Sequence, residues 1–588
     1  MSPLNLEKVD TYPLASRPSK VTAADFAAPP TAGASLREFL NTLPNILAVR
    51  SLRVASSLLP AVQRIVSKET FKEQIVPVMI CLAVLLVYVS FPTKNYYWDG
   101  IEFALRIERT SSLNVSLIHP NHLVYNLVGY LLYRLARDLG MQVRALEVLQ
   151  TVNSFLSALC AYVLFHILKI SLRSTYLAAT LTLLFAFSAT WWRFSTDANA
   201  YVSSILFLLI SFYLLLPARQ PQPMLLALTH SLAMCFHQLA VIFYPVVVLG
   251  LFLQTPSLTL RQRGLLALRY SGVAFTLTFG TFLLCFYLQA GAFDVRIFAN
   301  WLTSYSPEIG FTFNARNNLV FTLRGHARLF FGGRFNFLSG LMTPPIRLLT
   351  ITLGLLVLAL LGALVRRGKG REPNLETSRQ HLARFRPLLL PAATWWALYV
   401  VFLFFWIPQH TFYRMFYLPA IILLAGALLS SLRASDESPI RWRAALAVAL
   451  IALSNFLFLI YPYARVRAET PLFLAGRMKH IWTPGTVIYY ATPNTDNTLF
   501  EYFNPATTWK KLDSIETEEF ENELREIYRR GGDAWMDSSA IVRLMRSDKG
   551  VRLLAEHTGG RPGYKLNDPA YSVHFVQIFQ RDKASGGE

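Results

Sequence analysis

Charged residues are scarce in this chain. Only 15% of its 588 residues are Asp, Glu, Lys or Arg, whereas a soluble protein carries about 25%. The deficit falls in long uncharged runs and the mean hydropathy is +0.37, so we exclude a soluble globular protein. Acidic residues are the scarcer sign, with 35 against 56 basic residues and a formal net charge of +21. Because the basic residues cluster between apolar runs, they indicate loops that orient a membrane protein, and we expect no nucleic-acid partner.

Cysteines are also few. Cys81, Cys160, Cys235 and Cys285 all lie within apolar runs, which argues against a disulfide framework or a thiolate zinc site. The chain has no GxGxxG or P-loop motif for nucleotides. Its first residues lack the charged tip, apolar core and cleavage site of a signal peptide. These absences leave the apolar segments, and the polar groups between them, as the informative features.

Apolar runs long enough to cross a membrane recur along the chain. They cover 75–91, 145–169, 174–192, 200–217, 265–289, 346–365, 388–407, 414–432 and 442–463. A further run, 224–253, is interrupted at His237 and Pro245. We expect it to form two short helices that meet inside the membrane, or one broken helix that lines a cavity. If it crosses twice, about 11 spans place the five main basic clusters in the cytoplasm. The amphipathic segment 121–139 is expected to lie along the outer face.

The chain divides into three predicted parts. Residues 1–74 are expected to be a largely disordered cytoplasmic tail, 75–463 a polytopic α-helical membrane domain, and 464–588 a small extracytoplasmic α/β domain. In this last part the sequence predicts strands and helices that alternate. The strands are expected at 487–490, 534–536 and 573–579, and the helices at 539–546 and at 516–530, the latter capped by Asp513 or Ser514.

The first candidate site follows the first apolar run. Asp99 and Glu102 stand at i and i+3, so both carboxylates fall on one face of a helix at the membrane edge. Such a pair is either a solvated loop feature or a general base with a second acid that shapes its pKa or helps to hold a metal. His119 and His122 have the same spacing and could be metal ligands. We favour a role for one of them in orienting the loop or in hydrogen-bonding a substrate phosphate.

Further polar residues are predicted to lie at the same outer edge of the membrane. Asp197 and Asn199 belong to an outer loop rich in aromatic residues, a pattern that an interfacial aromatic belt also explains in part. His237 interrupts an apolar run. It is either a satisfied structural group or a binding residue, since ionisable groups inside a membrane are functional candidates.

His410, Tyr413 and Arg414 join two predicted spans on the outer side. An Arg beside His and Tyr suits capture of a lipid-linked phosphate, because guanidinium binds phosphate bidentately. Simple interfacial anchoring is the alternative. The loop 290–345 adds basic residues among aromatic ones, as expected of an interfacial segment that faces anionic headgroups.

These motifs resemble the GT-C superfamily of membrane glycosyltransferases, in a bacterial branch related to protein O-mannosyltransferases. The resemblance covers residues 75–260 best. The residues that carry it are Asp99 and Glu102 in an acidic motif, His119 and Pro120, the stretch with Trp192, Ser195, Ala198 and Tyr201, and His237. Asn199 stands where that branch has an acid.

The resemblance implies an inverting transferase that moves a sugar from a polyprenyl-phosphate donor to a hydroxyl acceptor on a glycan, lipid or protein. Transfer would occur at the outer face of a bacterial inner membrane, with the N-terminus cytoplasmic and the C-terminal domain periplasmic. Asp99 would take the acceptor proton, and Arg414 with neighbouring cations would stabilise the departing phosphate. Some relatives hold a divalent metal, Mg or Mn, at the first acid.

Two other functions stay open. One is a multi-span transporter, although no internal repeat is visible and the polar groups gather mainly at one face. The other is a non-catalytic GT-C-like scaffold of an envelope polysaccharide or glycan assembly system, which the departure at Asn199 favours.

Overall fold

The computed structural model describes residues 71–216, 221–303 except 256, 310–332, 375–431, 437–491 except 466, 468 and 469, 495–512, 517–558, 564–568 and 571–578, with isolated positions between 348 and 362. These residues form two compact units. The helical unit lies within Ala15–Pro92 and Arg106–Tyr461, and the sheet unit within Thr93–Leu105 and Pro462–Glu588. Each unit is described by itself. Nearly all of the predicted tail 1–74 and most of the predicted span 346–365 lie outside the described residues.

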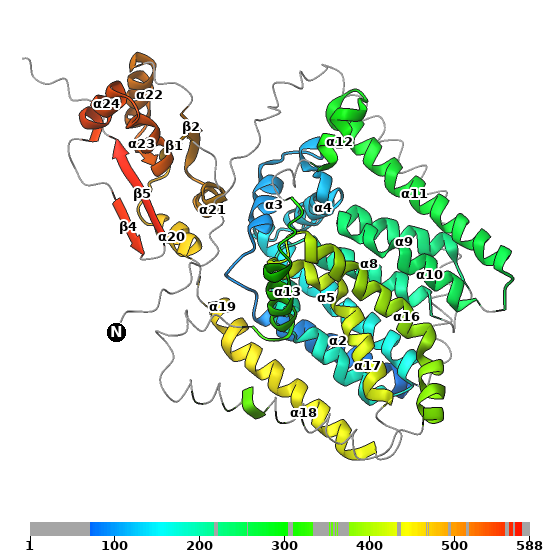
Figure 1. Ribbon diagram of the computed structural model, residues 1–588. Coiled ribbons are helices and arrows are strands. Elements are labelled where there is room, and N and C mark those ends of the chain that lie inside the picture. The colour runs from blue at the N-terminus through cyan, green and yellow to red at the C-terminus, as the bar shows by residue number, and fades with distance from the viewer. Residues whose placement is uncertain are drawn as a thin grey trace, which may run out of the picture. The chain divides into compact units, whose positions relative to one another are not determined.

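Helices make up the helical unit (Figure 1). They are α2 (Phe71–Ser90), α4 (Tyr125–Asp138), α5 (Ala145–Leu172), α6 (Thr175–Ala186), α7 (Ala189–Ser195), α8 (Tyr201–Leu214), α9 (Pro223–Phe236), α10 (Tyr244–Gln254), α11 (Leu260–Ala290), α12 (Val295–Thr303), α13 (Ala315–Phe330), α16 (Leu375–Phe405), α17 (Leu418–Ser431) and α18 (Glu437–Asn455). The shorter turns are η1 (Val115–Leu117), η2 (Pro120–His122), η3 (Gln238–Phe243), η5 (Phe412–Tyr417) and the π-helix η6 (Phe456–Ile460). Helices α3 (Trp98–Arg109) and α19 (Tyr461–Arg465) have residues in both units.

Several of these helices have the length and composition of membrane spans. Among the described residues, five stretches qualify: Ala145–Leu172, Leu260–Ala290, Pro387–Phe405, Phe412–Ser430 and Trp442–Arg465. Shorter apolar helices cover Ile75–Ser90, Tyr201–Leu214, Pro223–Phe236 and Gln238–Leu253. Helix α11 leaves Leu268 and Phe275 exposed, as a helix that faces lipid does. The prediction of a polytopic α-helical membrane protein is confirmed, and the count of about 11 spans stays a prediction.

The run 174–192 differs from the single straight span that the sequence predicts. Helices α6 and α7 are bent by 67° relative to each other. Ser188 between them is extended, and its carbonyl accepts from the Trp192 N–H at 2.9 Å, which starts the new helix. The Phe187 carbonyl accepts instead from Asn455 Nδ2 at 2.9 Å. A polar side chain from another helix therefore donates a hydrogen bond to the backbone carbonyl that the bend leaves without its helical partner.

The broken helix predicted over 224–253 is present. Helix α9 ends at Phe236, and His237 is extended, with φ −158° and ψ 126°. The 3₁₀ helix η3 follows directly and passes into α10, which has Pro245 in its first turn. The interruption lies at His237, and Pro245 occupies a position where a missing N–H costs nothing.

The sheet unit contains five strands in the order β2-β1-β3-β5-β4. They are β1 (Val487–Tyr490), β2 (Thr508–Lys511), β3 (Ala534–Asp537), β4 (Tyr564–Asp568) and β5 (Tyr571–Ile578), and the helices are α20 (Thr470–Met478), α21 (Thr495–Phe503), α22 (Thr517–Arg529), α23 (Ser538–Leu544) and α24 (Asp548–Thr558). Strands β2, β1 and β3 are parallel, and β5 pairs antiparallel with both β3 and β4.

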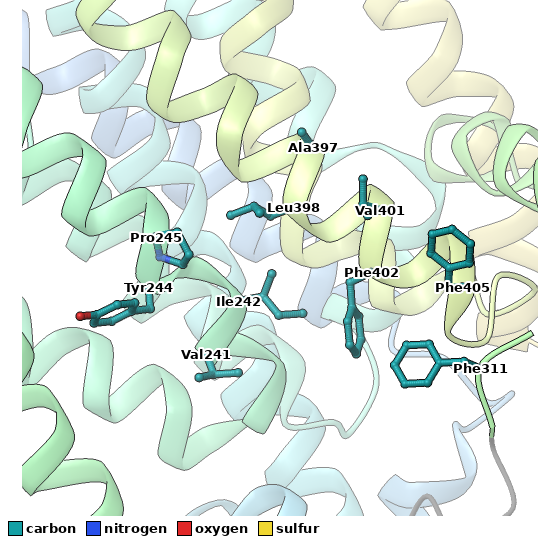
Figure 2. Close-up of a pocket in the computed structure, with 10 residues that line it drawn as sticks. All are labelled: Val241, Ile242, Tyr244, Pro245, Phe311, Ala397, Leu398, Val401, Phe402 and Phe405. Carbon is teal, nitrogen blue, oxygen red and sulfur yellow. The ribbon is translucent and has the colours of Figure 1, made fainter.

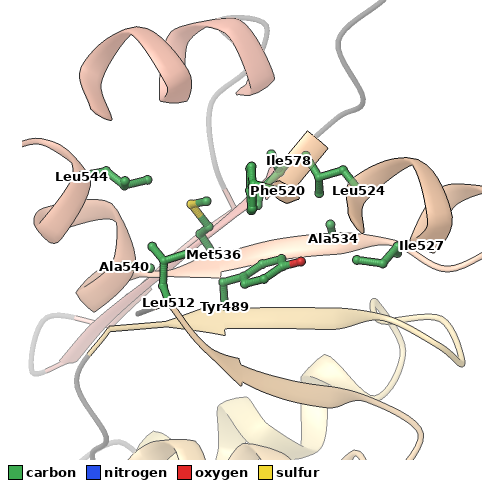
Figure 3. Close-up of a cluster of buried hydrophobic side chains, with 10 residues drawn as sticks. All are labelled: Tyr489, Leu512, Phe520, Leu524, Ile527, Ala534, Met536, Ala540, Leu544 and Ile578. Atoms are coloured by element: carbon green, nitrogen blue, oxygen red, sulfur yellow. The ribbon is translucent and has the colours of Figure 1, made fainter. Parts of the chain in front are cut away.

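Apolar side chains cover both faces of this sheet. Figure 3 shows the core on one face, where Tyr489, Met536 and Ile578 from the strands meet side chains of α22 and α23. On the other face the rings of Trp482, Phe500, Trp509 and Phe575 pack with centroids 5.1–6.3 Å apart. Helices on both faces of this mixed sheet make an α/β unit, as the sequence predicts.

The predicted strands and helices of this unit correspond to β1, β3, β5, α22 and α23. The sequence misses β2 and β4, which are the two edge strands. Edge strands carry little of the burial pattern on which strand prediction depends, and β2 alternates between exposed and half-buried residues. The cap predicted at Asp513 or Ser514 lies outside the described residues.

Candidate active site

Aromatic and imidazole side chains from four segments of the helical unit meet in one buried cluster. His119 and His122 come from η2, Tyr201 from the start of α8, His237 from the break after α9, and Tyr413 from η5. Ring centroids lie 5.3 Å apart for His119 and His122, and 4.7 Å apart for His122 and His237. The His237 ring is 5.0 Å from Tyr201 and 5.9 Å from Tyr413. The structure thus brings together four predicted site residues from distant parts of the sequence, His119, His122, His237 and Tyr413. Tyr201, which the sequence analysis gives only among the residues that carry the family resemblance, lies in the same cluster.

Hydrogen bonds to backbone carbonyls fix η2 against the break at His237. The Val124 N–H donates to the Cys235 carbonyl at 3.4 Å. Gln238 Nε2 donates to the Pro120 carbonyl at 3.0 Å and to the Leu302 carbonyl at 3.3 Å. One amide therefore ties η3 to η2 and to the end of α12. The sequence analysis did not assign this role to Gln238.

The hydrogen bonds of His237 place its proton. Its Nδ1 accepts from the Leu239 N–H at 3.1 Å, so the neutral ring carries its proton on Nε2. The His237 side chain is 1% exposed, and its Nε2 has no hydrogen-bond partner among the described residues. A buried donor that stays unpaired costs about 1–3 kcal/mol. His237 therefore holds an N–H that a ligand could engage.

The other two histidines are held in different tautomers. His119 Nδ1 accepts from the Asn121 N–H at 3.3 Å, whereas His122 Nδ1 faces the Phe236 carbonyl at 3.3 Å and must donate to it. Burial lowers the pKa of His119 well below its usual value, and electrostatic repulsion from its neighbours His122 and Arg106 lowers that pKa further. Burial lowers the pKa of His122 to about 4. Both rings are neutral at pH 7.

A polar stripe on α5 anchors the loop between α7 and α8. Asn153 Nδ2 donates to the carbonyls of Asp197 and Asn199 at 2.7 and 2.8 Å. Gln150 Nε2 donates to the Thr196 carbonyl at 3.1 Å. Gln150 and Asn153 are i and i+3, so they share one helix face. Neither residue was predicted as part of the site, and the signal that could have found them is this polar pair within an apolar span.

Asn199 acts on its own backbone. Its side chain is fully buried, and Nδ2 donates to the carbonyls of Phe194 at 2.6 Å and Asp197 at 3.2 Å. Its Oδ1 accepts from the N–H groups of Tyr201 at 3.1 Å and Val202 at 3.3 Å, in the first turn of α8. A carboxylate could replace the acceptor but not the two donated bonds. The amide is therefore what this loop requires where the resembling branch has an acid.

Arg414 also bonds to its own backbone. Its side chain is 1% exposed, with Nη1 donating to the His410 carbonyl at 2.8 Å and Nη2 to the Pro408 carbonyl at 2.7 Å. The His410 ring lies 5.0 Å from Phe412 and 6.2 Å from Tyr413. The structure therefore directs the two outer nitrogens of Arg414 to carbonyl groups of the loop that it ends. Phosphate capture by Arg414 stays a prediction.

Asp99 and Glu102 lie on the part of α3 that belongs to the sheet unit. Asp99 is in the first turn, where the helix dipole favours a carboxylate, and Glu102 follows one turn later. Both residues are half-buried. Nearby, the Tyr96 ring stacks on Phe503 at 5.7 Å and holds the segment against α21. The two acids share a helix as predicted, and their catalytic roles stay predictions.

An apolar groove of about 620 Å³ runs between η3, α10 and α16. Figure 2 shows Val241 and Ile242 of η3 facing Leu398, Val401 and Phe402 of α16 across it. The remaining lining residues are Tyr244, Pro245, Phe311, Ala397 and Phe405. Apolar side chains and aromatic rings make up the whole lining, so the groove suits a hydrocarbon chain. It shares η3 with the histidine cluster, because His237 is the N-cap of that helix.

Comparison with known proteins gives a fold. No model of a protein family matches the sequence. No curated protein matches it. The structure is similar to that of ArnT from Cupriavidus metallidurans bound to undecaprenyl phosphate, with a TM-score of 0.52 and 11% identity over 88% of this chain and 100% of that one. The chain has the GT-C fold.

ArnT in the apo state gives the same result, with a TM-score of 0.50 and 14% identity over 86% of this chain and 97% of that one. The GT-C superfamily predicted from the short motifs is thus confirmed as the fold of this chain. The branch related to protein O-mannosyltransferases stays a prediction. At such low identity the likeness concerns the fold, so the activity must be argued from the site.

The GT-C fold leaves open whether a metal takes part. Among the residues that the structure describes, no three His, Cys, Asp or Glu side chains gather where they could hold a metal ion. In the histidine cluster, Nδ1 of His119 and of His237 accepts from a backbone N–H, so each neutral ring carries its proton on Nε2 and has no lone pair left for a metal. Of the three rings, His122 alone keeps an Nε2 lone pair, so the cluster does not fit a metal. Mg or Mn at Asp99 stays a prediction.

Proposed function

We propose that this integral membrane protein is an inverting glycosyltransferase that moves a sugar from a polyprenyl-phosphate donor to a hydroxyl acceptor. The observation that carries the proposal is the His237 Nε2–H, which is buried at the start of η3 and has no hydrogen-bond partner among the described residues. The same short helix supplies Val241 and Ile242 to the apolar groove. A donor with a polar head and a hydrocarbon tail fits this arrangement, because the head can accept from the His237 N–H and the tail can lie in the apolar groove.

The fold supports the same donor class. The ArnT structure to which this chain is similar is bound to undecaprenyl phosphate. We propose that the tail of the donor occupies the groove and that its head meets His119, His122 and His237, with His410, Tyr413 and Asp197 near the sugar. In their neutral tautomers His119 and His237 can donate from Nε2 to phosphate oxygens, whereas His122 Nε2 can accept from a sugar hydroxyl.

Asp99 is proposed as the general base. The acceptor oxygen attacks the anomeric carbon and forms the new glycosidic bond, while the bond from that carbon to the phosphate oxygen breaks. The hydroxyl proton passes to the Asp99 carboxylate, and polyprenyl phosphate leaves with the bonding electrons. Attack on the face opposite the leaving group inverts the configuration. Glu102 would shape the pKa of Asp99.

The setting of this reaction is part of the proposal. The acceptor hydroxyl would belong to a glycan, lipid or protein at the outer face of a bacterial inner membrane. The N-terminus would lie in the cytoplasm and the sheet unit in the periplasm. The catalytic domain would be 75–463, with 464–588 as a separate periplasmic domain.

The test uses purified protein in lipid nanodiscs with a panel of radiolabelled polyprenyl-phosphate sugars. Wild type is compared with Asp99→Asn and with a matched control, Asp138→Asn, which changes an exposed acid at the end of α4. We expect wild type and the control to consume one donor. Loss of a general base should slow Asp99→Asn by about 10²–10⁴-fold.

Three results would speak against the proposal. Equal turnover by Asp99→Asn would remove Asp99 as the base. Donor binding without turnover, even with acceptor extracts present, would favour a scaffold. No binding of any donor would favour a transporter.

A further inference from the structure

The turn between α16 and η5 is strained. Ile407 has φ +44°, in the left-handed region that β-branched residues rarely adopt. Its side chain is 4% exposed, so the turn is part of the packed interior. A backbone of this kind persists only when the surrounding structure holds it. The residues that follow, 408–413, include His410 and Tyr413 of the candidate site.

Arg414 holds the turn in place by hydrogen bonds. Its guanidinium donates to the Pro408 and His410 carbonyls, which lie one and three residues after Ile407. The Arg414 N–H donates to the Thr411 carbonyl at 3.0 Å. One buried side chain therefore bonds the turn at two points and its own backbone bonds it at a third. Lysine could not reproduce the two-pronged geometry.

Helix α13 closes over the guanidinium. A Cβ on Gly325 would lie 2.4 Å from both Cζ and Nε of Arg414, which is closer than atoms can approach. One residue further on, His326 Nε2 lies 3.3 Å from the hydroxyl of Tyr417 in η5. Gly325 therefore allows α13 to lie directly against Arg414. We call this arrangement of the Arg414 side chain on η5 against Gly325 on α13 the clamp.

We propose that Arg414 is a positioning residue that holds the strained turn at Ile407 and so sets the places of His410 and Tyr413, rather than a ligand of the donor phosphate. The consequence reaches the cluster, because the Tyr413 ring lies 5.7 Å from Tyr201 and 5.9 Å from His237. The structural part of this inference stands without the proposed function, and only its kinetic part rests on it.

The structural test is hydrogen exchange of the full chain in nanodiscs. The amide of His410 donates to the Ile407 carbonyl at 3.1 Å, so it reports on the turn, as does the amide of Arg414. In Arg414→Lys and in Gly325→Ala we expect exchange at these two amides to rise about tenfold, since each variant disturbs the side-chain bonds that hold the turn. Gly325→Ala keeps the arginine, so it answers the question even if Arg414→Lys folds poorly.

Two matched controls separate the clamp from the substitution itself. Gly280→Ala on α11 adds a methyl group where no atom of the described residues outside the adjoining helix backbone lies within 4 Å, and Arg316→Lys changes an exposed arginine on α13. Both should exchange as wild type does at 407–414. If both clamp variants also exchange as wild type does there, the proposal is overturned.

The kinetic test distinguishes positioning from phosphate binding. For a positioning residue we expect Arg414→Lys to lower kcat about tenfold while the donor KM changes less than twofold. A raised donor KM with unchanged exchange would mean that Arg414 binds the donor, and would overturn the proposal. If wild type transfers no sugar, the proposed function fails, and the exchange result still decides the clamp.

Discussion

Asn199→Asp is the substitution that most directly tests how the α7–α8 loop is built. The wild-type amide donates to the Phe194 carbonyl at 2.6 Å and to the Asp197 carbonyl at 3.2 Å. Asp197 keeps its bond from Asn153 at 2.7 Å. The Phe194 carbonyl is left facing a carboxylate oxygen. The Phe194 carbonyl still accepts from the Asp197 N–H at 3.3 Å, so the variant loses one hydrogen bond there, about 0.5–1.5 kcal/mol, and the cost of a buried charge adds to this.

The assay is thermal unfolding in nanodiscs, followed for Asn199→Asp and Asn199→Ala. Each kcal/mol of lost stability lowers Tm by about 2–4 °C in a domain of 150–250 residues, and by less in a longer chain. The aspartate variant should be less stable than the alanine variant at pH 7.5, because only the aspartate carries a charge. Burial raises the pKa of a carboxyl, so its penalty is present at high pH and is relieved as pH falls.

The result that would refute this reasoning is an Asn199→Asp protein with wild-type Tm at pH 7.5. A rise in transfer activity without loss of stability would be more damaging. It would mean that the position is catalytic and that the amide is a defect of the site rather than a cap of α8.

Three further predictions follow from burial and from the groove. Burial lowers the pKa of His122 to about 4, whereas its pKa in the unfolded chain is near 6.5. The free energy of unfolding is therefore unaffected by this group above pH 6.5 and falls by at most about 3 kcal/mol as pH drops to 4. The Tm of His122→Asn should depend less on pH. Val401→Trp should fill the groove and weaken polyprenyl-phosphate binding about tenfold in a binding assay, whereas Leu453→Trp on an exposed face of α18 should not. Met536→Ala should destabilise the sheet unit by about 2–5 kcal/mol, seen as faster exchange of β1 and β3, with donor binding unchanged.

The sequence predicts those parts of the fold that depend on periodic or continuous hydrophobicity. The apolar runs yield the membrane helices, and the break at His237 is visible as a polar interruption. The bend at Ser188 is not, because it depends on Asn455, 267 positions away, which satisfies the carbonyl of Phe187. Long-range partners of this kind carry no local signal.

The candidate site divides in the same way. Residue type and position were enough to select His119, His122 and Tyr413 in the outer loops and His237 inside an apolar run. The structure brings these four residues to one cluster. They could not reveal the bonds that hold the cluster, such as those of Gln238 to Pro120 and Leu302. An amide side chain gives no indication in sequence of which carbonyls it will meet.

A polar side chain at a buried site can bind the ligand or hold the backbone. Its hydrogen-bond partners distinguish these two roles. Asn199 engages both amide atoms with backbone groups, and Arg414 directs its two outer nitrogens to carbonyls. A ligand that used the Asn199 amide would have to break those bonds first, which reduces the net gain from binding. His237 keeps an N–H that has no partner among the described residues. A ligand oxygen that accepts from it removes an existing penalty as well as forming a bond. His237→Ala should therefore lose donor affinity while losing little stability, whereas Asn199→Ala should do the reverse.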